Sequence, residues 1–539
     1  MREKKITDYI VEFLISKGVK SIFGYPGGVI CHFLDSTTKY KAELSTYINY
    51  HEQAAAFAAC GYAQECGAPG VAFATSGPGA TNLLTGIAQA WFDSLPVLFF
   101  TGQVDTYGLR TDVAMRQRGF QETDIAAMAS PVTKYCARID DPLSVPYELE
   151  KAWWSITNGR PGPALLDLPA DVQRAFCNFD GCTHFIPENT EDTARDAEAV
   201  IRNGLAQARR PLVLAGAGIR QSGQTDNFRS FIEACRLPVV TSMPALDLLE
   251  YDHPLHMGFI GVNGHQYANS ILEESDTVFV LGSRLDLKQI GKNRGTFLPK
   301  AKLFRVDIDD AELRYKANIN ETAIYTDLRA LMPLLGRIRI DFGLRDPEWE
   351  DTARKVKQDL KLLDDTGQVH SYLRLLSRNF SEEVHYTLDV GLNQLWAAQA
   401  LELKPGQRVH MSAGLGSMGY SLPAAIGACC ACGKPLVAIS GDGGMQMNIQ
   451  ELQFIANKNL PVAVFVVNNF SLGMICGFQK KNFDENYTQT TVSTGYSVPN
   501  FEKIAAGYGI PYIDIQHPDD LKKCIWNMEG PIIMELKIS

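Results

Sequence analysis

Short apolar runs alternate along the chain with stretches whose apolar residues recur at helical spacing. The clearest unit is 434–473. Its first run, Leu436 to Ile439, ends at a Gly-Asp-Gly turn, and its second, Val462 to Val467, ends at Asn468-Asn469. A helical pattern over 449–458 lies between them. Such a unit has a right-handed crossover and parallel strands, so both polar turns are expected at the carboxyl ends of the strands, where open sheets bind ligands.

The same alternation continues in both directions and predicts an α/β fold with three doubly wound parallel-sheet domains, over 1–180, 190–340 and 365–539. The apolar runs taken as strands of the first two domains are 21–28, 45–50, 71–76, 96–102, 211–219, 237–242, 276–286 and 302–310. Two charged stretches, 189–200 and 346–365, are interpreted as linkers, the second of them as a solvated helix.

Composition narrows the class of protein. A net charge of −10, without a basic run, argues against a nucleic-acid partner. The N-terminus lacks the apolar core of a signal peptide, and no apolar run reaches the ~20 residues of a membrane helix, so we expect a cytoplasmic protein without a membrane partner. Cys429 and Cys432 form a CxxC inside an Ala-rich helical stretch, where we interpret them as small apolar fillers.

The two polar turns have a definite chemistry. Asp442 and Asn469 offer hard oxygen ligands of the kind that Mg²⁺ takes together with phosphate oxygens. Glycines at 441, 443 and 444 let backbone N–H groups approach a diphosphate at the start of a helix. Far upstream, Glu52 stands where a strand meets an Ala-rich helix. Taken alone, it is a helix-start carboxylate favoured by the helix dipole.

A second interpretation starts from Gly414, Gly416 and Gly419, which form a GxGxxG after a strand and before a helix. Asp442 ends the next strand and could then be the acid that binds a ribose. A nicotinamide-dependent dehydrogenase is therefore an alternative, although it gives Asn469 and Glu52 no role.

The Gly-Asp-Gly turn, 24 further residues and Asn-Asn resemble the signature of thiamine-diphosphate (ThDP) enzymes. Seven more motifs, in order, are similar to those of acetolactate synthase, the acetohydroxyacid synthase large subunit. They are FGYPGG (23–28), HEQAA (51–55), TSGPGATN (75–82), DSLPVLFFTGQV (93–104), FQETDI (120–125), PVTKY (131–135) and GRPGPALLDLP (159–169). The resemblance implies pyrimidine-binding, central Rossmann-like and diphosphate-binding domains, in that order.

The resemblance also implies roles for individual residues. Asp442, Asn469 and the carbonyl of Ser471 would hold Mg²⁺, Glu52 would hydrogen-bond the pyrimidine of ThDP, and Met418 would support the bent cofactor. The residues implied to face substrate are Gly28, Phe120 and Gln121. The other residues implied to bind cofactor are Pro26, Asn82, Val390, Gly391, Gly416, Gly441, Gly443, Gly444, Leu472, Gly473 and Met474.

The implied reaction is that of a carboligase, a transferase or lyase that decarboxylates a 2-oxo acid such as pyruvate and passes the two-carbon unit to a carbonyl acceptor. The absence of a His-His pair favours ligation over aldehyde release. The resemblance further implies a homodimer or homotetramer with active sites at the dimer interface; it leaves a regulatory subunit open. A non-catalytic ThDP-binding protein is a third alternative, although such a protein has no use for Glu52.

Some positions depart from the family pattern. Phe478 stands where acetolactate synthases that prefer 2-ketobutyrate have tryptophan, and Leu287-Lys288 replaces an Asp-Arg pair. Phe478 and Lys288 together suggest a different acceptor, such as an aldehyde or a keto-sugar. The central domain keeps part of the family's FAD pattern at 216–218 and 282–286 but departs from it at 261–269, so FAD is compatible with the sequence without being required by it.

Overall fold

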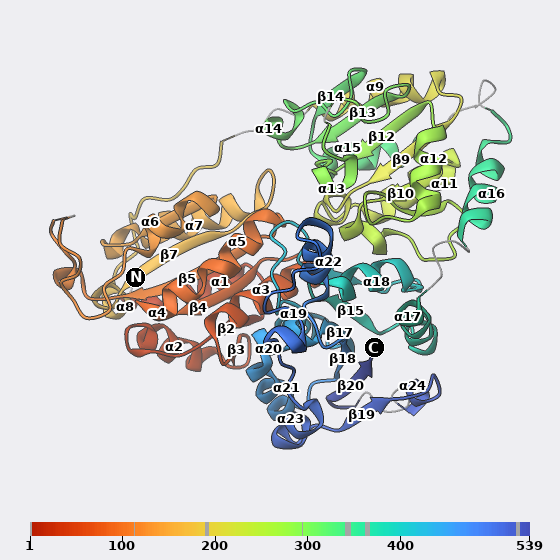
Figure 1. Ribbon diagram of the computed structural model, residues 1–539. Coiled ribbons are helices and arrows are strands. Elements are labelled where there is room, and N and C mark those ends of the chain that lie inside the picture. The colour runs from red at the N-terminus through yellow and green to blue at the C-terminus, as the bar shows by residue number, and fades with distance from the viewer. Residues whose placement is uncertain are drawn as a thin grey trace. The chain divides into compact units, whose positions relative to one another are not determined.

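The computed structural model describes residues 3–538 except 113, 189–192, 294, 340–345, 362–366 and 524–528 (Figure 1). The predicted domain limits at 190, 340 and 365 lie outside the described residues. The chain forms two compact units. The first comprises Met1–Glu188, Tyr386–Asn393 and His410–Ser539, and the second comprises Asn189–His385 and Gln394–Val409. The three predicted parallel α/β sheets are confirmed.

The first sheet has the strand order β3-β2-β4-β5-β7-β6, and its paired strands are parallel. Its strands are β2 (Ser21–Gly24), β3 (Ser45–Ile48), β4 (Gly70–Ala74), β5 (Val97–Gln103), β6 (Tyr135–Arg138) and β7 (Ala164–Pro169). Its helices are α1 (Ile6–Ser16), α2 (Cys31–Thr37), α3 (Glu52–Cys66), α4 (Pro78–Asn82), α5 (Leu84–Phe92), α6 (Ile125–Ala129), α7 (Val145–Thr157) and α8 (Ala170–Arg174). A short antiparallel pair, β1 (Lys4–Lys5) and β8 (Phe176–Cys177), accompanies it.

The third sheet has the order β16-β15-β17-β18-β20-β19. Its strands are β15 (His385–Leu388), β16 (Val409–Met411), β17 (Leu436–Gly441), β18 (Val462–Asn468), β19 (Tyr512–Ile515) and β20 (Ile532–Lys537). Its helices are α19 (Ser421–Cys432), α20 (Asp442–Met447), α21 (Leu452–Lys458), α22 (Gly473–Asn482), α23 (Phe501–Tyr508) and α24 (Asp520–Lys523). The helix predicted over 449–458 is in fact a 3₁₀ turn, Ile449–Glu451, followed by α21, and a separate helix begins at Asp442 itself.

The second unit contains the sheet β11-β10-β9-β12-β13-β14. Its strands are β9 (Pro211–Ala215), β10 (Val239–Thr241), β11 (His256–Phe259), β12 (Thr277–Leu281), β13 (Lys302–Asp307) and β14 (Glu321–Tyr325). Helices of the central part of the chain are α9 (Ala194–Gln207), α10 (Gly218–Gln221), α11 (Thr225–Cys235), α12 (Gln266–Glu274), α13 (Leu287–Ile290), α14 (Asp310–Leu313), α15 (Leu328–Leu335), α16 (Trp349–Lys361), α17 (Gln368–Asn379) and α18 (Leu392–Ala400).

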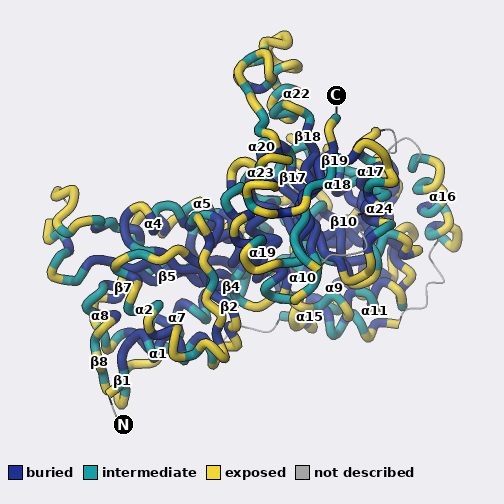
Figure 2. The backbone as a smooth tube through the Cα atoms, turned by 90° about the horizontal axis from the view of Figure 1, so that it is seen from below, coloured by how far each residue is buried: buried dark blue, intermediate teal, exposed yellow. Residues whose placement is uncertain are grey.

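The strands read as continuous apolar runs because helices cover both faces of each sheet. In β5, Phe99 packs with α3 and α5, whereas Phe100 packs with α1, α2 and α7 on the opposite face. Figure 2 shows strands such as β4, β5 and β7 in the dark blue of buried residues. Among the described residues, no helix combines the length and apolar character needed to cross a membrane.

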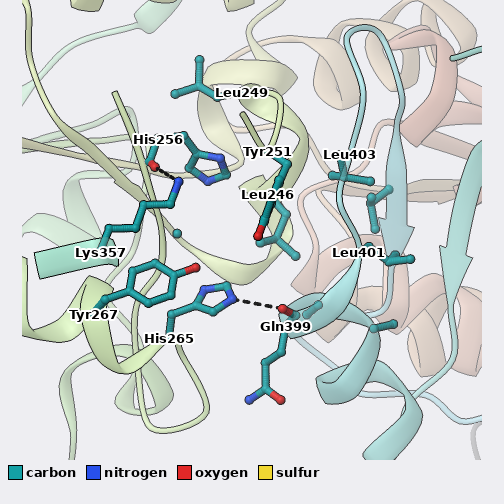
Figure 3. A pocket seen from close by; sticks show the side chains of 14 residues that line it. Leu246, Leu249, Tyr251, His256, His265, Tyr267, Lys357, Gln399, Leu401 and Leu403 are labelled. Carbon is teal, nitrogen blue, oxygen red and sulfur yellow. Dashed lines mark hydrogen bonds between the residues drawn. The ribbon is translucent and has the colours of Figure 1, made fainter. Parts of the chain in front are cut away.

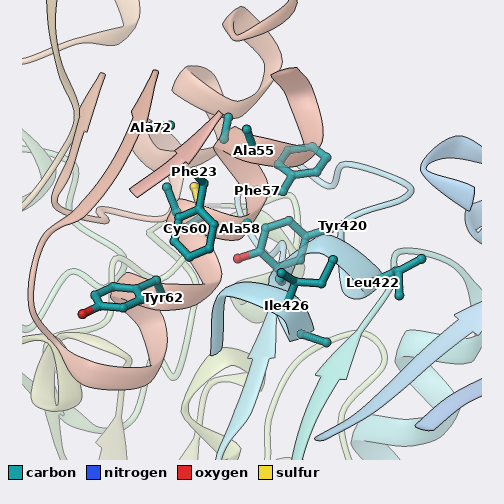
Figure 4. Packing of buried hydrophobic residues seen from close by; sticks show 14 of the residues in the cluster. Phe23, Ala55, Phe57, Ala58, Cys60, Tyr62, Ala72, Tyr420, Leu422 and Ile426 are labelled. Atoms are coloured by element: carbon teal, nitrogen blue, oxygen red, sulfur yellow. The ribbon is translucent and has the colours of Figure 1, made fainter. Parts of the chain in front are cut away.

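Helices α3 and α19 join the first and third sheets into one unit. A Cβ on Gly61 of α3 would lie 2.2 Å from the carbonyl oxygen of Ala424, and one on Gly427 of α19 would lie 1.8 Å from that of Ala58. The two glycines therefore let the helix backbones approach closely. Phe57 and Tyr420 add an edge-on ring contact at 5.2 Å, which is seen from close by in Figure 4. Burial raises the pKa of the Cys429 thiol to about 12, as expected of a structural cysteine.

The helix predicted within 346–365 is confirmed as α16, but it is not solvated on all sides. Helix α16 buries Trp349 and Ala353 in the core of the second unit, and the Trp349 indole N–H donates to the carbonyl oxygen of Pro211 at 2.8 Å. The charged residues that suggested a solvated helix occupy only the other positions of an amphipathic one.

Candidate functional site

The first part of the site is built around Glu52, the first residue of α3. The side chain of His51 caps this helix by accepting from the Gln53 backbone N–H at 3.0 Å. Glu52 is only 9% exposed, and its Oε2 accepts a hydrogen bond from Nδ2 of Asn82 at 2.9 Å. A Cβ on Gly79 would lie 3.1 Å from Oε1 of Glu52, so the bare glycine leaves room beside that oxygen. Glu52 and Asn82, which were both predicted to bind the cofactor and lie 30 positions apart in sequence, are thus brought together.

The residues implied to face substrate lie on loops of the same sheet. Gln121 has a positive φ of 65°, and its side chain packs against the backbone of Gly77. Phe120 is 85% exposed, and a Cβ on Gly28 would meet nothing within 4 Å, so both positions border open space. Their roles toward substrate stay predictions.

The second part of the site lies at the carboxyl ends of β17 and β18. Asp442 is 2% exposed; its Oδ1 accepts from the Gly443 backbone N–H at 3.0 Å, while its Oδ2 is buried without a hydrogen-bond partner. Burial raises the pKa of Asp442 to about 6. The end of the Asn469 amide lies 2.7 Å from the carbonyl oxygen of Ser471 and 3.3 Å from Oδ1 of Asp442, and hydrogen bonding assigns its NH₂ group as the donor to both oxygens. Polar groups of Asp442, Asn469 and Ser471, from two neighbouring strand ends, therefore converge.

This cluster fits a hard divalent cation as well. Without an ion the NH₂ group of Asn469 donates to the other two oxygens, and turning the amide over would place its oxygen beside them as a third ligand. Mg²⁺ prefers carboxylate, amide and carbonyl oxygens and completes its shell with water and phosphate oxygens. The predicted metal residues are thus in reach of one another, while the ion itself stays a prediction.

Several residues expected around ThDP lie at the same strand ends, where side chains of the chain itself pack over the glycines. A Cβ on Gly443 would lie 2.8 Å from Leu472 and 3.4 Å from the terminal methyl of Met418, so the side chains of two different loops meet over this glycine. A Cβ on Gly473 would lie 2.6 Å from Nδ2 of Asn469. The remaining positions, Pro26, Val390, Gly391, Gly416, Gly441, Gly444 and Met474, are placed on loops or element ends without a contact that tests their role.

The loop containing GxGxxG is not available to a pyrophosphate. The backbone N–H groups of Ala413 and Gly414 donate to the carboxylate of Asp93 at 3.1 and 2.6 Å, and that of Gly419 donates to Asp389 at 2.9 Å. In a dinucleotide site such groups would bind the ligand's phosphates. Two carboxylates of the chain itself occupy them, so the dehydrogenase interpretation fails at its central motif.

Glu451 is a buried carboxylate that the sequence pattern did not single out. It accepts from the Tyr50 backbone N–H at 2.7 Å and from Nδ2 of Asn49 at 2.9 Å, both in the turn that leads to Glu52. Burial raises the pKa of Glu451 to about 7. Asn448 lies close by, and its Nδ2 donates to the carbonyl oxygen of Gly419 at 2.8 Å. The segment after the Gly-Asp-Gly turn therefore fixes the turn that carries Glu52.

The two residues suggested for the acceptor pocket belong to different units. Phe478 on α22 is 58% exposed and contacts Phe483 with ring centroids 5.9 Å apart. Lys288 lies in α13 of the second unit and is exposed. A joint acceptor pocket stays a prediction.

In the second unit, which the sequence marks as a possible FAD site, a Cβ on Gly216 would lie 2.1 Å from the carbonyl oxygen of Gly282, so close packing of two turns accounts for these glycines. Flavin absorbance of the purified protein would test FAD.

Comparison with known proteins agrees with this geometry. Three thiamine pyrophosphate enzyme models match the chain: the N-terminal TPP binding domain over residues 4–128, the central domain over 200–335 and the C-terminal TPP binding domain over 389–535. Fold, site and matches together define a ThDP-dependent enzyme.

Individual proteins that are similar over nearly the whole chain show to which family of ThDP enzymes it belongs. The acetolactate synthase isozyme 2 large subunit of Escherichia coli is 34% identical, with 98% of this chain and 95% of the relative covered. The acetolactate synthase large subunit of Lactococcus lactis is also 34% identical, with 98% and 92% covered. The probable acetolactate synthase large subunit of Methanocaldococcus jannaschii is 35% identical, with 96% and 89% covered. The chain belongs to the acetolactate synthase large subunit family of ThDP enzymes, and the dehydrogenase alternative is wrong.

Proposed function

We propose that the protein decarboxylates pyruvate and ligates the resulting two-carbon unit to a carbonyl acceptor, in a reaction that needs ThDP and Mg²⁺. The observation that carries this proposal is the buried carboxylate of Glu52, whose Oε2 is held by Asn82 and whose Oε1 lies beside Gly79, where a Cβ would be only 3.1 Å away. A helix-start carboxylate with a purely structural role needs neither the orienting amide nor a glycine beside it. The relatives named above support pyruvate as donor.

Residues of this chain would have separate roles in binding the cofactor and in catalysis. Glu52 would hold a proton toward the pyrimidine ring of ThDP at Oε1, the carboxylate oxygen that lies beside Gly79. Asp442, Asn469 and Ser471 would hold the Mg²⁺ that binds the diphosphate. Met418 and Leu472 would shape an apolar surface over Gly443 that excludes water. ThDP, when bound, supplies the electron sink for decarboxylation.

The direct test is to incubate the purified protein with ThDP, Mg²⁺ and pyruvate alone, and to follow CO₂ and acetolactate. Both products should appear, and both should be lost when Mg²⁺ is removed by a chelator. ThDP binding without CO₂ release from pyruvate would contradict pyruvate as donor.

A second candidate keeps pyruvate as donor and changes the acceptor. The observation that favours it is Phe478 in place of the tryptophan of the family pattern, on an exposed stretch that also includes Met474 and Ile475. In that case pyruvate alone should give slow CO₂ release and little acetolactate. Adding an aldehyde or a keto-sugar should then increase CO₂ release and give a ligated product detectable by mass spectrometry.

We further propose that the active form is at least a homodimer, with Glu52 and Asp442 of one site supplied by different chains. Mixing inactive Glu52→Gln and Asp442→Ala chains should then restore at most about a quarter of wild-type activity, since half of randomly formed dimers are mixed and each has one intact site of two. Subunit exchange is verified by native mass spectrometry. Full exchange without any recovered activity would show that each site is built from one chain.

A further inference from the structure

The second unit contains a cavity of its own. Its enclosed volume is only about 20 Å³, and it continues into space that is open to solvent (Figure 3). Its apolar wall comes from the segment around η6 (Met243–Leu248), from the end of α18 and from the chain that follows it; the wall residues are Leu246, Leu249, Ala397, Ala398, Leu401, Leu403 and Val409. Against this wall stand two basic side chains, His256 on β11 and Lys357 on α16.

Lys357 is an ammonium group without a paired anion. Its Nζ donates to the backbone carbonyl oxygen of His256 at 2.7 Å and lies 5.6 Å from the ring centroid of Tyr251. Within the part of the chain that the structure describes, no carboxylate forms an ion pair with it. Burial lowers the pKa of Lys357 to about 8, with Lys361 lowering it further and Asp252 raising it. At neutral pH the cavity therefore contains a positive charge with donors to spare.

His256 supplies the complementary group. Its Nδ1 hydrogen-bonds the carbonyl oxygen of Glu250 at 3.1 Å, while its Nε2 is buried and has no hydrogen-bond partner. Burial lowers the pKa of His256 to about 3, so the ring is neutral, with the proton on Nδ1 and a lone pair on Nε2. The neighbouring His265 differs, because both its nitrogens are engaged, Nδ1 by the Phe259 backbone N–H and Nε2 by the carbonyl oxygen of Gln399.

A ligand that fits must therefore offer an anion to Lys357, a donor to Nε2 of His256 and an alkyl body to the leucine wall. We propose that this cavity binds a small aliphatic 2-hydroxy acid, whose carboxylate pairs with Lys357 and whose hydroxyl donates to His256. A phosphate would match the ammonium but not the apolar wall, and an alkane would leave both polar groups unpaired. The reaction proposed above yields a product of this chemical class, but binding here does not depend on turnover.

The test uses the holoenzyme and 2-hydroxyisobutyrate as probe, with calorimetric titration at pH 7. Saturable binding is expected. Isobutyrate, which lacks the hydroxyl, should bind several-fold more weakly, and 2-hydroxyisobutyramide, which lacks the charge, at least about tenfold more weakly. Lys357→Met should weaken binding of the acid by a similar factor, and Lys357→Arg should retain part of it. Lys361→Met is the matched control, since it removes a neighbouring charge that does not line the cavity.

Three results would overturn the proposal. One is the absence of saturable binding to the wild type, which would leave the cavity to water. Another is equal binding of the acid by wild type and Lys357→Met, which would place the probe elsewhere, for example at the cofactor site. The third is equal affinity for acid and amide. If thermal melting shows that Lys357→Met is unfolded, His256→Phe decides, because it removes the acceptor and should abolish the preference for 2-hydroxyisobutyrate over isobutyrate.

Discussion

Replacing Glu52 by Gln should lower CO₂ release from pyruvate by roughly 10²- to 10⁴-fold while ThDP stays bound. The amide has the shape of the carboxyl group and can still accept from Asn82, so the fold of the β3–α3 turn is expected to survive. What it loses is the ability to share a proton with the cofactor's pyrimidine ring. Steady-state CO₂ release and ThDP binding by fluorescence quenching measure the two effects separately.

Glu12→Gln is the matched control, because it makes the same chemical change on α1, where Glu12 bonds Lys4 and Tyr40 at the surface of the first sheet. It should leave CO₂ release within about twofold of wild type. If Glu52→Gln kept more than a tenth of the activity, Glu52 would be a helix-start carboxylate without a part in the chemistry, and the main support for the proposed function would be lost.

The sequence predicted the sheets well because strands covered on both faces carry continuous apolar runs. The run 71–76, for example, is β4, and 96–102 is β5. It also predicted that Asp442 and Asn469 would meet, since both end neighbouring parallel strands and parallel strands align their carboxyl ends. These predictions depend on local pattern and on one topological rule.

Contacts between distant segments could not be predicted in this way. Glu451 accepts a hydrogen bond from the turn before Glu52, 401 positions away in the chain. The sequence around Glu451 shows only an acidic residue within a helical pattern, between Gln450 and Leu452, and gives no sign of this contact. Likewise, α16 looked solvated because most of its residues are charged, whereas burial of Trp349 and Ala353 decides where it packs. The carboxylates that occupy the GxGxxG loop, Asp93 and Asp389, also come from other elements.

The buried carboxylates give the cofactor-free protein a defined pH dependence. A carboxyl whose pKa is raised on folding binds more protons in the folded state than in the unfolded one, so stability falls as pH rises between the two pKa values. For Asp442 this window extends from its ordinary value near 4 to about 6, and for Glu451 from about 4.5 to about 7. Asp389 and Asp167, also buried with raised pKa values, act in the same direction. The contribution of these carboxyl groups to the stability of the cofactor-free protein should therefore fall between pH 4 and 7, whereas that of His256 and His265, whose pKa values burial lowers to about 3 and about 4, should rise up to their ordinary value near 6.5.

Asp442→Asn should separate stability from function. At pH 7 the cofactor-free variant should be more stable than wild type by about 1–3 kcal/mol, because the change removes a charge that burial disfavours, as the raised pKa of Asp442 shows. The difference should vanish below about pH 4, where Asp442 is protonated in both folded and unfolded chains.

The Asp442→Asn variant should also bind Mg²⁺ and ThDP at least about 100-fold more weakly than wild type. Thermal and urea unfolding at pH 4 and 7, with and without Mg²⁺ and ThDP, measure both effects, and Glu451→Gln is the companion variant that should keep Mg²⁺ binding. A cofactor-free Asp442→Asn protein less stable than wild type at pH 7 would mean that the carboxylate already has a stabilising partner, and unchanged Mg²⁺ affinity would place the metal away from this turn.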